Sequence, residues 1–186
     1  MSPQPHQIKF TYEDYLLFPE DGRRHEIIDG DHYVTPSPST KHQRISLRLS
    51  TAIANFLNRK PVGEIFAAPF DVVLSDLDFV QPDLVFVAKG HGSIVTEKNI
   101  HGALDLVIEI LSEKTRRTDE VVKRKLYERF GVGEYWIVDP ELETVKVYRM
   151  SDQGYARTAE LTREAQHSLS TPLLPDLHIP LTDIFE

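Results

Sequence analysis

The chain has 186 residues, of which 40% are hydrophobic and 27% are charged, and its formal net charge is −8. This size and composition predict one globular domain over residues 1–186, and the acidic balance argues against a protein that coats nucleic acid without selectivity, because neutralising phosphates requires clustered Lys and Arg. The chain has no cysteine, which excludes disulfides, zinc–thiolate sites and cysteine nucleophiles.

The first forty residues predict a short helix and a β-hairpin. The run from Thr11 to Asp14 has the spacing of a capping box, which should start a short helix that Pro19 closes. Asp29-Gly30 lies between two short β-prone runs, and this dipeptide favours a tight hairpin turn.

The next segment predicts the main long helix and three strands. Apolar residues recur at helical spacing over 42–58 and form one apolar stripe. Strands are expected over 65–74 and 79–87, joined by a short turn. The run over 104–111 is nearly continuously apolar, so we expect a strand that is buried on both faces.

The second half of the chain predicts another helix over 118–130, with Thr118 as its N-cap and Gly131 just after its end. Three strands should follow, over 134–139, 144–149 and 155–161. Prolines in the last fifteen residues indicate a mostly irregular tail. This order of elements is typical of a mixed α/β domain.

Two carboxylates interrupt apolar strands: Asp83 lies in the run over 79–87, and Glu109 lies in the run over 104–111. An ionised carboxylate removed from water is costly unless something compensates its charge. Three explanations stay open. The acids could lie at strand ends in contact with water, pair with Arg or Lys, or bind a divalent metal, which prefers oxygen ligands.

The helix after Glu109 adds weight to the metal explanation because it carries Lys123. A metal makes hydroxide accessible near neutral pH and neutralises charge on phosphate. Between Ser112 and Phe130, seven Lys and Arg outnumber four Asp and Glu. This stretch is a candidate polyanion-binding surface, although a solvated helix face explains the same charges. The candidate contacts are Lys114, Arg116 and Arg117.

At these positions the chain resembles a known group of nucleases. The segments over 80–87 and 106–112 are similar to the Pro-Asp…Glu-X-Lys core of the PD-(D/E)XK nuclease superfamily. The closer resemblance is to its Uma family of putative restriction endonucleases, and it extends over nearly the whole chain, 12–185. Further matching pieces are Glu26 to Gly30, His42, the spacing of Asp119, Lys123 and Tyr127, and Gly131 to Asp139.

The resemblance implies a restriction-endonuclease-like fold, with a mixed central β-sheet flanked by helices and an N-terminal helix and hairpin. It also implies metal-dependent hydrolysis of DNA phosphodiester bonds. Asp83 and Glu109 would bind Mg²⁺ or Mn²⁺, with the Ile110 carbonyl as a third ligand. Glu26 matches an early acidic position and could add a ligand, directly or through water.

The motif lysine departs from the superfamily pattern, because Leu111 occupies its place. The resemblance implies that the lysine has moved to the following helix, where Lys123 matches and would polarise the attacking water or contact phosphate. Lys125 is the alternative, but it lies two positions along the helix and should face elsewhere.

Four other polar or aromatic residues have two interpretations each. Asp119 serves either the helix start or the active site. We expect His42 to be a packed or capping residue rather than a base. Tyr127 and Trp136 should be core or interface residues rather than base-stacking platforms. An exposed Tyr or Trp near the last strands would suit a homodimer.

Two rival functions remain beside the DNA endonuclease. One is a binding module for nucleic acid or protein that keeps the fold without turnover, and the other is a hydrolase of small phosphate esters. No apolar run is long enough to span a bilayer, and the first nine residues lack a secretory-signal pattern. We therefore expect a cytoplasmic protein that does not contact membranes.

Overall fold

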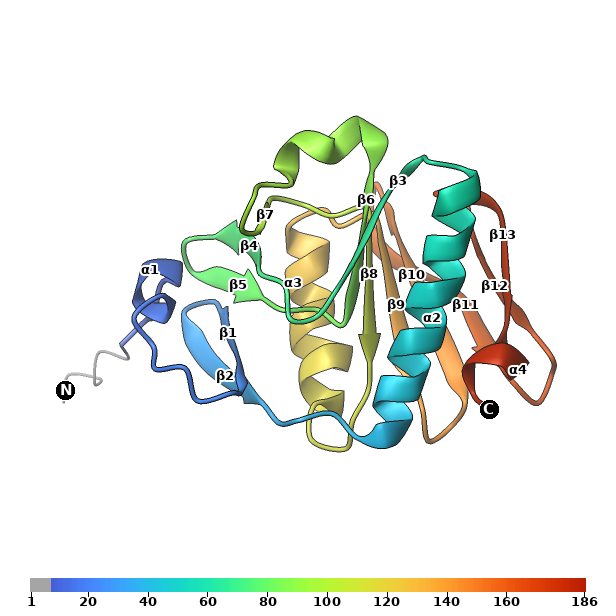
Figure 1. The fold of residues 1–186 in the computed structure, drawn as a ribbon. Coiled ribbons are helices and arrows are strands. Elements are labelled where there is room, and N and C mark those ends of the chain that lie inside the picture. Colours follow the sequence, from blue (N-terminus) through green and yellow to red (C-terminus); the bar gives the residue numbers. More distant parts are fainter. Residues whose placement is uncertain (1–7) are drawn as a thin grey trace.

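The computed structural model describes residues 8–186 (Figure 1). Residues 1–7, which contain most of the segment judged for a secretory signal, lie outside the described part. In the first half the elements are α1 (Tyr12–Tyr15), β1 (Arg24–Ile28), β2 (Asp31–Thr35), α2 (Thr40–Arg59), β3 (Gly63–Ala67), β4 (Val72–Ser75), β5 (Asp78–Val80), β6 (Leu84–Ala88), η1 (Lys89–Ile94) and β7 (Ile100–His101). The second half contains β8 (Leu106–Ile110), η2 (Thr118–Lys123), α3 (Arg124–Arg129), β9 (Glu134–Asp139), β10 (Thr144–Ser151), β11 (Gly154–Thr162), β12 (Ser168–Thr171), β13 (Leu174–Pro180) and α4 (Leu181–Ile184).

The central sheet has six strands in the order β11-β10-β9-β8-β6-β3. Strands β8 and β9 run parallel, and the other neighbours run antiparallel. Figure 1 shows the central strands between α2 and α3. Because side chains alternate along a strand, Ile108 of β8 packs in one core with Leu49 of α2, whereas Val107 packs in a second core with Tyr127 of α3. The mixed sheet flanked by helices is therefore confirmed.

A second sheet, in the order β2-β1-β5-β4-β7, contains the predicted hairpin. Asp29 and Gly30 have φ values of 53° and 74°, as the two central residues of a type I′ turn require. The predicted capping box is also present, because the side chain of Thr11 accepts from the amide of Asp14 and Asp14 bonds back to the amide of Thr11. Both local predictions are confirmed.

The two long strands predicted over 65–74 and 79–87 are wrong. Each run divides into two strands that belong to different sheets: β3 and β6 lie in the central sheet, while β4 and β5 lie in the second. Pro69 and Pro82 fall in the two breaks, and proline cannot donate a backbone hydrogen bond to a strand ladder. Asp83 therefore lies at the crossing between the sheets, directly before β6.

The predicted N-cap at Thr118 and the predicted irregular tail are both wrong. Thr118 lies inside the helical segment rather than at its N-cap, and the amide of Thr115 instead bonds to the hydroxyl of Ser112, 3.2 Å away. The tail after residue 161 is largely regular, because β12, β13 and α4 bury Leu169 and Leu181 against α2. Proline lies at exposed positions of β13, where the lost donor costs little.

The part of the chain that the structure describes contains no helix long and apolar enough to cross a bilayer.

Gly63 should resist substitution because β3 and β6 approach closely there. A Cβ at Gly63 would clash with the carbonyl oxygen of Val87 and the ring of Phe86. We expect Gly63→Ala to lower the free energy of unfolding by about 1–3 kcal/mol, measured by urea denaturation. Gly90→Ala is the matched control, since no atom lies within 4 Å of its added Cβ. Equal stability of the two variants would contradict the described packing.

Candidate active site

Asp83 is buried, and both of its carboxylate oxygens are occupied. Its Oδ1 accepts from the guanidinium NH1 of Arg24 at 2.9 Å. Its Oδ2 accepts from the backbone amide of Ile110 at 2.9 Å and lies 3.0 Å from the Nε2 of His42. The contacts come from β1, from the end of β8 and from the start of α2, so Asp83 joins three elements at the sheet crossing.

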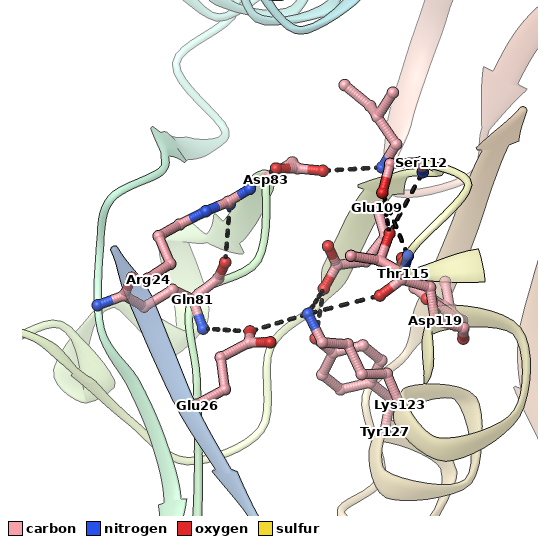
Figure 2. A network of polar contacts seen from close by, with 12 residues as sticks. Arg24, Glu26, Gln81, Asp83, Glu109, Ser112, Thr115, Asp119, Lys123 and Tyr127 are labelled. Atoms are coloured by element: carbon pink, nitrogen blue, oxygen red, sulfur yellow. Dashed lines mark hydrogen bonds and ion pairs between the residues drawn. The ribbon is translucent and has the colours of Figure 1, made fainter. Parts of the chain in front are cut away.

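Lys123 lies at the centre of a buried cluster of three carboxylates (Figure 2). Its Nζ lies 2.8 Å from Oε1 of Glu26, 2.9 Å from Oε1 of Glu109 and 3.6 Å from Oδ1 of Asp119. The hydroxyl of Tyr127 donates a further bond of 2.9 Å to Oε1 of Glu109. The cluster therefore ties β1, β8, η2 and α3 together.

Local sequence patterns explain how these side chains reach one place. Arg24 and Glu26 are two residues apart on β1 and share a face of the strand. Asp119 and Lys123 are four residues apart in η2, a turn of π-helix, and both are buried. Such turns are frequent at functional sites. Lys125 is exposed, which confirms that it faces away from the cluster.

The acids and Lys123 line one pocket of about 550 Å³. One wall is the segment from Tyr33 to Pro38, and the opposite wall is the loop and helix start after β8. The pocket brings together the sequence-predicted residues Glu26, Asp83, Glu109, Ile110, Lys114 and Lys123, together with His42 and Asp119. A polar pocket with an acidic floor and a basic residue on its rim is suited to a cation and a phosphate.

The carboxylates of the pocket differ in their electrostatics. Burial raises the pKa of Asp83, but the hydrogen bond and charge of His42, the charge of Arg24 and the amide of Ile110 outweigh it and lower the pKa to about 2. Burial raises the pKa of Glu109 to about 8 and that of Asp119 to about 6, with neighbouring carboxylates adding to both shifts. Ionising all of these acids at once is therefore costly, because they are buried close to one another.

Lys123 remains protonated in this surrounding. Burial lowers the pKa of its ammonium, but the charges of Glu109, Glu26 and Asp119 outweigh this and hold the pKa well above its ordinary value. A permanently charged ammonium can donate hydrogen bonds to water or phosphate but cannot accept a proton. The pocket thus contains a fixed cation among acids that carry more charge than it neutralises.

The donor set fits a divalent cation such as Mg²⁺ or Mn²⁺, because it consists of carboxylate oxygens and carries surplus negative charge. Within residues 8–186, however, no three Asp, Glu or His side chains are arranged so that they could hold a metal directly. Asp83 is bonded to Arg24, and Glu109 and Glu26 are bonded to Lys123. Some of these contacts would have to open for a metal to bind.

The three predicted DNA contacts occupy different environments. Lys114 is exposed and lines the pocket, and Arg117 is exposed on the adjoining helical segment. Arg116 instead forms two hydrogen bonds with Asp139, of 2.6 and 3.1 Å, and it does not line the pocket. The prediction of Arg116 as a surface contact overlooked this structural partner.

The aromatic residues are core residues, as expected. Tyr127 and Trp136 are fully buried, so Trp136 cannot provide the exposed aromatic side chain that would suit a homodimer. His42 is also buried, and its Nδ1 has no hydrogen-bond partner among residues 8–186. The cap of α2 is Ser39, so His42 is packed rather than capping. In addition, it contacts Asp83.

Sequence reasoning did not select Arg24, although a signal was present. In the predicted strand, Arg24 lies two residues before Glu26 and therefore on the same face. Its partner Asp83 is 59 residues away, so no local pattern links them. The contacts of Tyr127 and His42 with the acids are likewise long-range, at 18 and 41 residues.

The model of the Uma2 family, described as "Putative restriction endonuclease", matches residues 12–182. The chain belongs to this family. It is 28% identical over 158 residues to an uncharacterized protein of Synechocystis sp., with 82% of this chain and 80% of that protein covered.

A solved structure supports the fold. The crystal structure of "a putative nuclease belonging to DUF820" from Anabaena variabilis is similar to this chain with a TM-score of 0.78 and 23% sequence identity. The match covers 95% of this chain and 97% of that one. The resemblance to Uma proteins and the restriction-endonuclease-like fold expected from it are thus confirmed. The family and the fold do not by themselves assign roles to the pocket residues.

The pair of Arg116 and Asp139 in this Uma2 protein should stabilise the fold in a pH-dependent manner. Burial raises the pKa of Asp139, but the bonds from Arg116 and the amides of Leu142 and Glu141 lower it below its ordinary value. We expect Arg116→Met to lower the free energy of unfolding by about 1–2 kcal/mol at neutral pH. The loss should shrink below a pH of about 4, as Asp139 is protonated in the folded wild type.

Urea unfolding across this pH range measures the effect, with Arg117→Met as the control. A difference between wild type and Arg116→Met that stays constant down to strongly acidic pH would show that the ion pair does not cause it.

Proposed function

We propose that this Uma2 protein is a metal-dependent endonuclease that hydrolyses DNA phosphodiester bonds. The observation that carries the proposal is the convergence of Asp83, Glu109 and Lys123, from separate elements, on the floor of one polar pocket. Asp83 and Glu109 match the acidic positions of the superfamily motif, and Lys123 would replace the motif lysine, whose place Leu111 occupies. Family membership and fold support the same reaction class.

Asp83 and Glu109 would hold Mg²⁺ or Mn²⁺, with the Ile110 carbonyl as a further ligand and Glu26 as an additional one, direct or through water. When bound, the cation makes hydroxide accessible near neutral pH and neutralises charge that develops on the phosphate. Tyr127 would orient Glu109 through its hydrogen bond to Oε1. His42 would orient Asp83 in the same way.

Lys123 would act as a hydrogen-bond donor. Because its pKa lies well above the ordinary value, its ammonium stays charged at neutral pH. It could therefore orient the attacking water or contact the scissile phosphate, but it could not remove a proton from water. The proton would have to pass to solvent or to a neighbouring carboxylate.

DNA would approach over the rim formed by Lys114 and Arg117. Both side chains are exposed; Lys114 lines the pocket, and Arg117 lies on the adjoining helical segment. Cations at these positions would offset the repulsion between phosphate and carboxylates. The protein would act as a single domain in the cytoplasm, without contact with membranes. By analogy with many restriction-type nucleases, it would form a homodimer.

One observation favours a second candidate, a binding module without turnover. The acids already have protein cations as partners, with Arg24 on Asp83 and Lys123 on Glu109. If these contacts never open, the pocket binds no metal. Such a protein would bind DNA or a protein partner and would not cleave. A hydrolase of small phosphate esters, the remaining rival, would cleave such an ester in preference to DNA.

A cleavage assay with Mg²⁺ or Mn²⁺ on supercoiled plasmid and single-stranded DNA tests the proposal. Asp83→Asn, Glu109→Gln and Lys123→Met should each reduce the rate by at least about 100-fold, because each removes a charge from the reacting centre. Lys125→Met is the matched control, since this exposed lysine lies on the same helical segment and should leave the rate unchanged.

Circular dichroism identifies any variant that loses its fold, which matters for Lys123→Met because it leaves buried acids without their partner. Full activity of Lys123→Met would remove the displaced lysine from the reaction. An inert wild type with either metal on both substrates would favour the binding module.

The salt dependence of DNA binding should separate the rim cations. Lys114→Gln and Arg117→Gln should each reduce the slope of log K against log salt by about 1. Arg116→Gln should leave the slope nearly unchanged, because Asp139 holds its guanidinium. Fluorescence anisotropy with a DNA duplex measures the slopes. A reduced slope for Arg116→Gln alone would place the interface elsewhere on the helix.

A further inference from the structure

Arg24 occupies the carboxylate oxygen of Asp83 that no other group holds. Its NH1 donates to Oδ1 of Asp83 at 2.9 Å and to the carbonyl oxygen of Gln81 at 3.3 Å. Oδ2 of Asp83 is already occupied by Ile110 and His42. A cation that binds to Asp83 would either displace one of these donors or share Oδ1 with the guanidinium of Arg24, where the two positive charges repel. Arg24 is the most exposed of the three donors and therefore the one most able to move.

The two buried cations differ in how firmly they are held. Lys123 contacts three carboxylates, and 5% of its side chain is exposed. Arg24 contacts one carboxylate, lines the pocket, and has 19% of its side chain exposed. Moving Lys123 would leave three buried acids without a partner, whereas moving Arg24 would free only Asp83. Arg24 is thus the cation that can change its partner.

The guanidinium of Arg24 also has further N–H donors that are available to a ligand. Among residues 8–186, Arg24 donates side-chain hydrogen bonds through Nη1 only, so Nε and Nη2 donate to no acceptor there. A guanidinium presents its donors in a planar fork that matches phosphate. Figure 2 shows Arg24 beside Asp83 at the edge of the acidic cluster. A phosphate entering the pocket would meet these donors.

The charges of the pocket give a reason why a divalent cation would replace Arg24 at Asp83. Four carboxylates, Glu26, Asp83, Glu109 and Asp119, share the floor with two cations, Arg24 and Lys123, so the floor has a formal excess of two negative charges when all four acids are ionised. This excess repels a phosphate. A divalent cation neutralises it and competes directly with Arg24 for Asp83. Arg24 would then be available to a negatively charged substrate.

We propose that Arg24 binds a substrate phosphate, and that Asp83 holds Arg24 until a divalent cation takes its place on that carboxylate. The inference rests on the proposed function, since it assigns to Asp83 the role of a metal ligand. Arg24 serves two states of the same pocket. In the first it balances the charge of Asp83, and in the second it contacts the phosphodiester.

Titration calorimetry with Mn²⁺ alone provides the first test. Arg24→Met removes the competitor, so it should bind Mn²⁺ about 5-fold to 10-fold more tightly than the wild type. Arg23→Met is the matched control. The neighbouring Arg23 also lines the pocket, but its ion-pair partner is the exposed Asp21, 3.9 Å from its Nε. Its Mn²⁺ affinity should equal that of the wild type.

Fluorescence anisotropy with a DNA duplex in Ca²⁺, and again in EDTA, provides the second test. Arg24→Met should lose about 10-fold in DNA affinity in Ca²⁺ and little in EDTA, where Asp83 still holds the wild-type arginine. Arg24→Lys keeps the charge and serves if Arg24→Met does not fold. Its DNA affinity in Ca²⁺ should fall as well, because it lacks the fork.

A purely structural role for Arg24 predicts the opposite result for the metal, since a disordered Asp83 would bind Mn²⁺ more weakly. Weaker or unchanged Mn²⁺ binding by Arg24→Met would overturn the inference, as would the absence of Mn²⁺ binding by both proteins. Tighter Mn²⁺ binding with weaker DNA binding would support it even if the wild type cleaves no DNA, in which case only the nuclease proposal fails.

Discussion

The ion cluster around Lys123 is the interaction on which the arrangement of the molecule depends. A buried ammonium without partners would cost several kcal/mol, and so would each buried carboxylate. Lys123 on η2 therefore requires Glu109 at the end of β8 and Glu26 on β1. The contact with Glu26 joins the N-terminal hairpin to the central sheet, so the second sheet and the pocket wall that extends from it are positioned by this cluster.

The stability of the fold alone does not explain why these charged residues are buried together. Apolar residues of similar volume often stabilise a core as well as buried ion pairs do, and here four acids share two fixed cations. Burial, with the neighbouring carboxylates adding to it, makes Glu109 so costly to ionise that its pKa rises to about 8. An arrangement that leaves negative charge uncompensated in a pocket open to solvent is better explained by a ligand that carries positive charge than by folding.

The sequence predicted those parts of the fold that have local signals. The Thr11 capping box, the Asp29-Gly30 turn and the apolar β8 are set by neighbours in the chain, and all three are present. The split of two long β-prone runs between sheets was not predicted, because a strand ladder on either side of Pro69 and Pro82 depends on distant partners. The pairing of Arg24 with Asp83 is equally non-local, as is that of Arg116 with Asp139.

The packing of Leu111 gives a physical reason for the proposed displacement of the motif lysine to Lys123. Leu111, where the superfamily pattern has lysine, packs in the core beside Leu126 of α3 and does not line the pocket. A lysine there would bury its charge among apolar side chains. From η2, across the same face of the sheet, Lys123 places its Nζ 2.9 Å from Glu109. The helical segment therefore places an ammonium beside that carboxylate, which a side chain at position 111 would not do.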